Sequence, residues 1–340
     1  MKKNIIFLFL MLITGLIIFK GCRPPGESIG ENVEIGAAKV SLQLQWVTQA
    51  QFAGYYTALE KGWYKDEGID LSIYPGAPDI VPVDLVAAGS RDFGTTLLAD
   101  LAVEIQRGKE VISIAQIQQN NGLRLLAKKS SHIKRPKDFT GKKVGVWLGG
   151  WETQFNALLA LEKIAPEDVE VISQGFSMAP FLDGRLDVAS AMIYNEYYVV
   201  LASGMDKEAL VVIDYADYGL GFLGDVLFTS QKVRTKHPDL CLKMARASIK
   251  GWQYALDHQD EAADIVVKHD RTGIAKTDHQ QKMMGEIALL VRGDHGPQIG
   301  RADTQAISRM VELLVRQKQL DRPIPVERIY TPEFIEQIGR

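Results

Sequence analysis

Cysteine is almost absent from this chain of 340 residues, which contains only Cys22 and Cys241. Small secreted folds that are held by disulfides use several cysteine pairs, so this class is excluded. Cys241 lies beside Leu242, Met244 and Ala245, and it is predicted to be a small buried apolar residue. The stability of the protein must therefore come from buried cores.

Motifs for metal binding and catalysis are also missing. The histidines are scattered, and they form neither an HExxH pattern nor a cluster with cysteine; they occur at positions 132, 237, 258, 269, 279 and 295. The sequence contains no nucleophile elbow, Walker loop or pair of residues that resembles a catalytic dyad. We therefore predict no metal, no cofactor and no catalytic residue, which fits a protein that captures a ligand rather than converting it.

One formal match to a dinucleotide-binding fingerprint is rejected. Residues 219–224 read GLGFLG, but a GxGxxG fingerprint has to open a helix. The next residues, 225–229, read DVLFT and predict a strand. The glycines are therefore expected to allow tight turns.

An excess of positive charge is absent as well. The chain has 39 Lys and Arg against 42 Asp and Glu, and residues 1–21 contain three of the lysines and no acidic residue. The remainder is thus more acidic than the whole. Such a chain has no electrostatic reason to bind nucleic acid.

The N-terminus has the one long apolar run that bears on localisation. Residues 5–19 follow two lysines and are fewer than the ~20 residues that a membrane-spanning helix needs, which is typical of a signal peptide. We predict a signal peptide over residues 1–21, with the small residue Gly21 before Cys22 resembling a lipoprotein cleavage site. Lipidation of Cys22 would leave no internal disulfide.

Residues 22–38 are rich in Gly, Pro and Glu and predict a flexible, lipidated tether. The protein is therefore expected to be exported and anchored by lipid to the periplasmic or extracellular face of the cell membrane.

Strand-like and helix-like segments alternate from Lys39 onward, which indicates an α/β fold. Strands are expected at 40–46, 69–75, 91–96, 111–117, 141–147, 169–173, 185–193 and 209–215, and helices at 52–61, 80–88, 99–107 and 153–164, near Pro180 and from Asn195. Residues 237–340 are expected to be mainly helical.

The length and the two α/β series predict two lobes with a cleft between them. We expect lobe I to comprise 39–126 and 227–340, and lobe II to comprise 127–226. The chain is expected to cross between the lobes at 123–129 and to return at 225–231.

Aromatic and amide side chains crowd the junction between the first strand and the first helix. In open α/β sheets such a junction faces a ligand crevice, so this crowding suggests a pocket for a flat, polar ligand. The side chains are those of Trp46, Gln49, Gln51, Phe52, Tyr55 and Tyr56. A core role is equally compatible with the rings of Phe52, Tyr55, Tyr56 and Trp63, because they also fit helical spacing.

Five motifs occur in order along the chain: WVTQAQFAGYYTALEKGWYKDEGIDL (46–71), AGSRDFG (88–94), DFTGKKVGVWLGGWE (138–152), GRLDVASAMIYNE (184–196) and DYGLGFLGDVL (217–227). Together they resemble one family, the solute-binding proteins of ABC importers for thiamine-pyrimidine precursors, with relatives for riboflavin and, more distantly, alkylsulfonates. The similarity covers about residues 39–330 and is more specific for the family than for the ligand.

The resemblance implies a type II periplasmic-binding-protein fold, whose two lobes close on a small molecule and present it to a membrane permease and its ATPase subunit. It implies a monomer, and it implies ligand contacts from both lobes. The implied ligand-binding residues are Gln45, Trp46, Phe52, Tyr55, Thr95, Thr96, Gly149, Gly150, Trp151, Glu152, Asn195, Glu196 and Asp225.

The ligand that the family implies is a small heteroaromatic compound. An aminopyrimidine could stack on Trp46, Tyr55 or Trp151, and its amine could bond to Glu196 and Asn195. A helix-start acid is the alternative role of Glu196, and Trp147 could belong to the core or to the pocket. Riboflavin is the alternative ligand, since the two tryptophans in WLGGWE could hold a larger ring.

The family also contains pyrimidine synthases, which carry a Lys and a His after the D-x-G motif and a cysteine-rich run farther along. This chain has Thr96 and Asp100 at the corresponding positions, and FLGDVLF in place of the cysteines. The amine that would form an aldimine with pyridoxal phosphate is missing. We therefore expect a binding protein and not an enzyme.

Overall fold

The computed structural model describes residues 37–148, 151–293 and 299–339. The predicted signal peptide and Cys22 lie outside these residues, as do Gly149 and Gly150. None of the described helices combines the length and the apolar character that are needed to cross a membrane.

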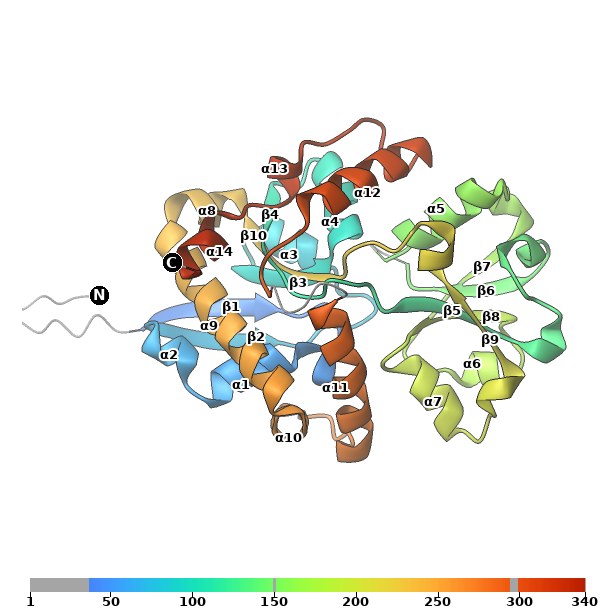
Figure 1. The fold of residues 1–340 in the computed structure, drawn as a ribbon, viewed down its shortest axis with the longest axis horizontal. Helices are drawn as coiled ribbons and strands as arrows, with labels where there is room; N and C mark the ends of the chain where they lie inside the picture. The colour runs from blue at the N-terminus through green and yellow to red at the C-terminus, as the bar shows by residue number, and fades with distance from the viewer. Residues whose placement is uncertain (1–36, 149–150, 294–298, 340) are drawn as a thin grey trace, which may run out of the picture. The chain divides into compact units, whose positions relative to one another are not determined.

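The first sheet has five strands in the order β2-β1-β3-β10-β4 (Figure 1). β1 runs parallel to its two neighbours, whereas β10 is antiparallel to both β3 and β4. The side chains of β3, β4 and β10 are buried throughout, as expected for strands that are covered on both faces. The strands are β1 (Ala38–Gln43), β2 (Ile69–Tyr74), β3 (Phe93–Leu97), β4 (Val111–Gln116) and β10 (Asp225–Ser230).

The second sheet repeats this plan in the order β7-β6-β8-β5-β9. β6 is parallel to β7 and β8, and β5 is antiparallel to β8 and β9. The strands are β5 (Leu123–Lys128), β6 (Lys143–Val146), β7 (Glu170–Ser173), β8 (Val188–Met192) and β9 (Leu210–Asp214). The predicted α/β class is confirmed, and every strand expected from the alternation is present to within a few residues.

The chain crosses between the sheets at different places from those expected. Residues 123–128 and 225–230 are strands inside the sheets, because each supplies the antiparallel strand in the fourth position. The connecting segments are 117–122 and 215–224, which are held together by hydrogen bonds from Asn121 N to Phe222 O (3.2 Å) and from Gly224 N to Gln118 O (3.0 Å). The expected lobe boundaries after residues 126 and 226 thus fall within strands, so we propose that the boundaries lie in these connecting segments.

Helices α5, α6 and α7 surround the second sheet, and the other helices belong to the first (Figure 1). The helices are α1 (Ala53–Glu60), α2 (Trp63–Asp66), α3 (Pro82–Ala87), α4 (Leu98–Gln106), α5 (Thr153–Glu162), α6 (Ala179–Leu182), α7 (Glu196–Ala202), α8 (Gln231–Lys236), α9 (Pro238–Asp257), α10 (Gln259–His269), α11 (Thr277–Arg292), α12 (Thr304–Arg316), α13 (Val326–Ile329) and α14 (Glu333–Ile338). Short 3-10 turns are η1 (Ala50–Phe52), η2 (Lys129–Ser131), η3 (Pro136–Phe139), η4 (Pro166–Asp168), η5 (Lys207–Ala209) and η6 (Tyr215–Tyr218).

Helix α1 packs closely against α9 beneath the first sheet. A Cβ atom on Gly54 would collide with the ring of Trp252, and one on Gly251 would collide with the carbonyl oxygen of Gly54. Only glycine allows the two backbones to come this close. This crossing fixes the position of α1, and α1 directly follows the aromatic junction.

Candidate ligand-binding site

The first sheet brings its predicted site residues together at one edge. Gln45 and Trp46 follow the carboxyl end of β1, and Thr95 lies near the carboxyl end of β3. Asp225 joins them because the antiparallel β10 begins at this edge, where Asp225 pairs with Leu97. The backbone N–H of Gln45 donates to Thr95 Oγ1 (3.0 Å), which ties two of these strand ends together.

The second sheet contributes residues by the same rule. Trp147 follows β6, Phe176 follows β7, and Asn195 and Glu196 follow β8. The carboxyl ends of parallel strands meet at one edge of a sheet and form the usual place for a ligand in such folds. Phe176 was missed by the sequence analysis, although its position after an expected strand is the signal that identified Trp46.

Four aromatic rings join the two edges. The ring of Trp46 lies 4.8 Å from that of Phe176, 5.4 Å from that of Trp151 and 5.7 Å from that of Trp147, measured between centroids. The arrangements are tilted or edge-to-face, which aromatic pairs prefer. Trp46 is only 5% exposed whereas Phe176 is 51% exposed, so the cluster runs from the interior to the surface. We call these four rings the aromatic cluster.

Asp225 is buried at the centre of a group of carboxamides. Its Oδ1 accepts a hydrogen bond from Gln45 Nε2 (2.8 Å), and its Oδ2 accepts from Gln51 Nε2 (2.7 Å) and from Gln118 Nε2 (3.3 Å). Burial raises the pKa of Asp225 to about 6, and the bonds from Gln51 and Gln45 oppose this shift. Three carboxamides thus stabilise a carboxylate that burial alone would disfavour.

The side-chain oxygen of Gln45 lacks a hydrogen-bond donor. Because its Nε2 faces Asp225, its Oε1 is turned elsewhere, and this buried oxygen has no hydrogen-bond partner. A buried acceptor of this kind is a suitable contact for a ligand N–H or O–H group. Gln118 was not among the predicted residues, although it follows β4 at the same edge.

Glu196 is a second buried carboxylate, on the side of the second sheet. It accepts hydrogen bonds from Met192 N (2.9 Å) and from Asn195 Nδ2 (2.6 Å). Burial raises its pKa to about 7, against the effect of these bonds. Burial, followed by the charges of Asp225 and Glu196, raises the pKa of Tyr194.

Two of the predicted residues belong to the core. Phe52 is fully buried, and Tyr55 packs edge-to-face against Trp252 with 5.8 Å between ring centroids. Helix α1 turns Tyr55 toward Trp252 of α9, whereas Phe52 is buried in the 3-10 turn η1 before α1, and these are the core positions that helical spacing had left open. The packing of both rings thus supports the core alternative, while the buried Tyr55 hydroxyl, which has no hydrogen-bond partner, stays a proposed ligand contact.

The remaining predicted residues are placed as follows. Thr96 is buried in β3, and the Glu152 side chain accepts a hydrogen bond from Trp151 N (3.0 Å) at the start of α5. Asp100 of α4 interacts with Thr153, also at the start of α5. Burial raises the pKa of Asp100 far above its usual value, and hydrogen bonds from Thr153 oppose this shift. Gly149 and Gly150 are outside the described residues.

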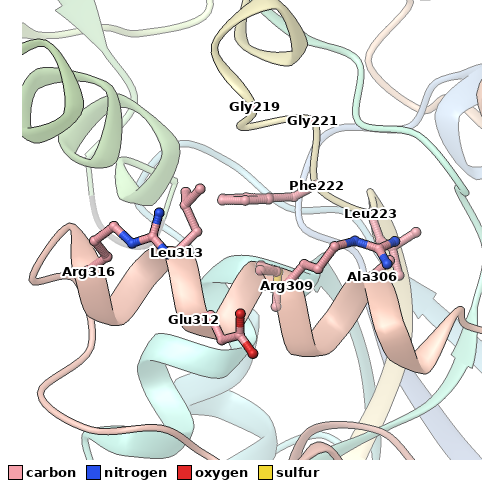
Figure 2. A pocket seen from close by; sticks show the side chains of 10 residues that line it. Gly219, Gly221, Phe222, Leu223, Ala306, Arg309, Glu312, Leu313 and Arg316 are labelled. Carbon is pink, nitrogen blue, oxygen red and sulfur yellow. The ribbon is translucent and has the colours of Figure 1, made fainter.

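Two cavities lie away from these residues. One, of about 320 Å³, lies between helix α12 and the loop that contains Gly219, Gly221 and Phe222 (Figure 2). The other, of about 570 Å³, lies between residues 71–76, at and after the end of β2, and residues 269–272. None of the predicted site residues lines either cavity, and the glycine loop leads into β10 rather than into a helix, which rules out the dinucleotide fingerprint.

No group of three or more His, Cys, Asp or Glu side chains within residues 37–148, 151–293 and 299–339 is arranged to hold a metal ion.

Comparisons with known proteins relate the chain to binding proteins along most of its length. It is 25% identical over 325 residues to the riboflavin-binding protein RibY of Chloroflexus aurantiacus, covering 92% of this chain and 90% of that protein. It is 22% identical over 335 residues to the formylaminopyrimidine-binding protein of Halalkalibacterium halodurans, covering 96% and 98%.

A solved structure shares the fold. The ligand-binding component of an ABC-type import system from Staphylococcus aureus superimposes with a TM-score of 0.63 at 14% identity, covering 88% of this chain and 98% of that one. The two-lobed periplasmic-binding-protein architecture expected from the sequence is thereby confirmed. Residues 49–262 match the NMT1/THI5-like family, and the chain therefore belongs to the NMT1/THI5-like family.

Proposed function

We propose that this protein is the extracytoplasmic solute-binding protein of an ABC importer, and that it captures an aminopyrimidine precursor of thiamine. The ligand would be of the formylaminomethyl- or hydroxymethyl-pyrimidine type. The observation that carries the proposal is the aromatic cluster, in which rings that follow strands of both sheets meet around Trp46, the neighbour of Gln45, whose amide binds the buried Asp225.

The chemistry of the site suits such a ligand. A pyrimidine has π faces that can stack on rings of the aromatic cluster, each contact adding about 0.5–1.5 kcal/mol beyond area burial. Its exocyclic amine is a donor, and the buried acceptors are Gln45 Oε1, which follows a strand of the first sheet, and the Glu196 carboxylate, which follows a strand of the second. Binding between the lobes would exclude water and favour closure.

Riboflavin is the second candidate. The number of rings in the aromatic cluster favours a ligand with a larger flat surface than a pyrimidine. The similarity to a riboflavin-binding relative over most of the chain supports the same alternative. An alkylsulfonate fits less well, because the charged residues among the buried side chains of the proposed site are the acids Asp225 and Glu196.

The site fits a ligand-binding protein better than it fits a synthase-like enzyme. Asp100, which stands where related synthases carry a histidine, is buried against Thr153, and Thr96 stands where they carry a lysine. A carboxyl and a hydroxyl cannot replace the amine of an internal aldimine. A synthase-like enzyme is therefore the less favoured alternative.

The proposed function includes anchoring to the membrane and contact with an ABC permease. Lipidation of Cys22, with residues 22–38 as the tether, would hold a monomeric binding protein next to its permease and ATPase subunit. The lobes would then deliver the ligand to the permease.

The test is ligand binding by the whole chain purified in detergent. Calorimetry and thermal unfolding would be run with hydroxymethylpyrimidine, formylaminomethylpyrimidine, riboflavin and an alkylsulfonate, and bound small molecules would be released by denaturation and weighed by mass spectrometry. A bound pyrimidine should raise the melting temperature, because a ligand that binds only the folded state stabilises it. Binding of riboflavin alone would favour the alternative, and binding of neither class would overturn the proposal.

A further inference from the structure

His279 extends the polar network of the candidate site, although it lies on helix α11 rather than at a strand end. Its Nε2 is 2.8 Å from Asn195 Oδ1, and Asn195 Nδ2 donates to Glu196 Oε1 (2.6 Å). Glu196 Oε2 accepts from Met192 N (2.9 Å). The three side chains thus form a line from α11 to a buried carboxylate.

The chemistry of this line fixes its orientation when Glu196 is ionised. A carboxylate only accepts hydrogen bonds, so Asn195 must turn its NH2 group toward Glu196 and its oxygen toward His279. Burial, and then the charge of Lys282, lowers the pKa of His279 and favours a neutral ring with a single N–H. That N–H must be on Nε2, because only a donor can face Asn195 Oδ1.

Helix α11 is well placed to carry this contact. In the same turn, Gln280 Oε1 accepts from the backbone N–H of Ala50, which lies between Trp46 and helix α1. About two turns after His279, Glu286 of α11 accepts a hydrogen bond from the hydroxyl of Tyr198 in α7 (2.6 Å). The start of α11 therefore contacts the loop after β1 and, through His279, the loop after β8.

We propose that His279 is a positioning residue of the ligand site: from a helix of the first lobe it holds the Asn195 carboxamide, and through it the Glu196 carboxylate, in the orientation that receives a ligand donor. This inference rests on the proposed function, because it assigns His279 to the same site.

The test is a double-mutant cycle at pH 8, using whichever pyrimidine or flavin the wild-type chain binds most tightly. His279→Leu removes the donor and should weaken binding roughly tenfold, the effect of one hydrogen bond. His279→Gln keeps an N–H donor and should restore most of the affinity. In an Asn195→Ala background, His279→Leu should have no further effect on affinity.

His258→Leu is the matched control, because His258 is exposed and its ring stacks on Tyr254 of helix α9. A purely structural role for His279 would lower the melting temperature of His279→Leu and leave affinity unchanged, or would give additive losses in the cycle. Either result would overturn the inference.

A measurement without ligand separates this inference from the proposed function. Nitrogen NMR of the imidazole should show the Nε2–H tautomer of His279 in the wild-type chain and lose this preference in Asn195→Ala. If the wild-type chain bound no pyrimidine or flavin, the proposed function would fail, and an Nδ1–H tautomer would independently overturn the role given to His279.

Discussion

Trp46 shows how much of the site one residue can reveal. Its position after the first strand predicts a place at a ligand crevice, but the sequence does not show which rings face it. In the structure its partners are Trp147, Trp151 and Phe176, all from the second sheet. Trp46 therefore contacts rings in the loops that follow the strands of the second sheet.

Trp46→Ala should weaken ligand binding roughly tenfold, because it removes the central stacking surface of the aromatic cluster. Calorimetric titration with the ligand identified for the wild-type chain would measure the change. Trp63→Ala is the control: Trp63 is partly buried but packs against Tyr254 and Lys250, away from the aromatic cluster. Equal affinity losses in the two variants would contradict a specific role for Trp46.

The two buried carboxyls of the proposed site, Asp225 and Glu196, should make stability fall as pH rises. Their pKa values increase from 3.8 to about 6 for Asp225 and from 4.5 to about 7 for Glu196, so the folded state binds more protons than the unfolded state in this range. The free energy of unfolding should then decrease between about pH 4 and pH 7, by on the order of 3 kcal/mol for each carboxyl.

Urea unfolding of the ligand-free protein at a series of pH values would measure this slope. The double variant Asp225→Asn, Glu196→Gln should lose that part of the slope, while the other titrating groups remain as internal controls. Parallel pH profiles for the variant and the wild type would show that these two carboxyls are not responsible.

At the scale of the elements, the alternation of strand and helix patterns predicts nearly every segment. Local periodicity and strand-end chemistry depend on neighbouring residues, so they can be read from the sequence. The role of Tyr55 could not be read from the sequence, because a ring at helical spacing can face either the core or the ligand. What packs on the helix decides between the two. Helix α9 supplies Trp252, and this contact places Tyr55 in the core.

The crossing of α1 and α9 should not tolerate a methyl group. Gly251→Ala should destabilise the protein by about 3 kcal/mol, because its Cβ would collide with the backbone of Gly54, which cannot move aside cheaply. Gly285→Ala is the matched control in helix α11, where a Cβ would meet open space, and it should stabilise by about 0.5–1 kcal/mol. Denaturant midpoints of the two variants would measure both changes, and a neutral Gly251→Ala would contradict the close approach.

For the whole molecule, two sheets of the same plan explain how residues far apart in sequence form one site. Each sheet receives its antiparallel strand from the part of the chain that has just crossed from the other. The carboxyl ends of β1 and β3 thereby meet Asp225 of β10, and the ends of β6, β7 and β8 supply the opposing side.

The proposed anchoring of the whole molecule is tested at Cys22. Cys22→Ala should move the protein from the membrane fraction to the soluble extracytoplasmic fraction, because the acceptor of the lipid would be lost. Cys241→Ala is the control, since this thiol is free and buried in α9. Fractionation followed by mass spectrometry of the N-terminal peptide would measure both location and lipid, and membrane retention of Cys22→Ala would contradict lipid anchoring at this residue.

The α/β class, the strands and helices, the rejection of the dinucleotide fingerprint and the family could be predicted from the amino-acid sequence, because each depends on local pattern or on ordered motifs. Three features became apparent in the folded chain alone: the aromatic residues that face the site, the places where the chain crosses between the sheets, and the addition of Gln118, Phe176 and His279 to the predicted residues. These outcomes depend on contacts between distant segments: a side chain's role follows from what packs against it, and no local pattern around His279 indicates that Asn195 lies 2.8 Å away.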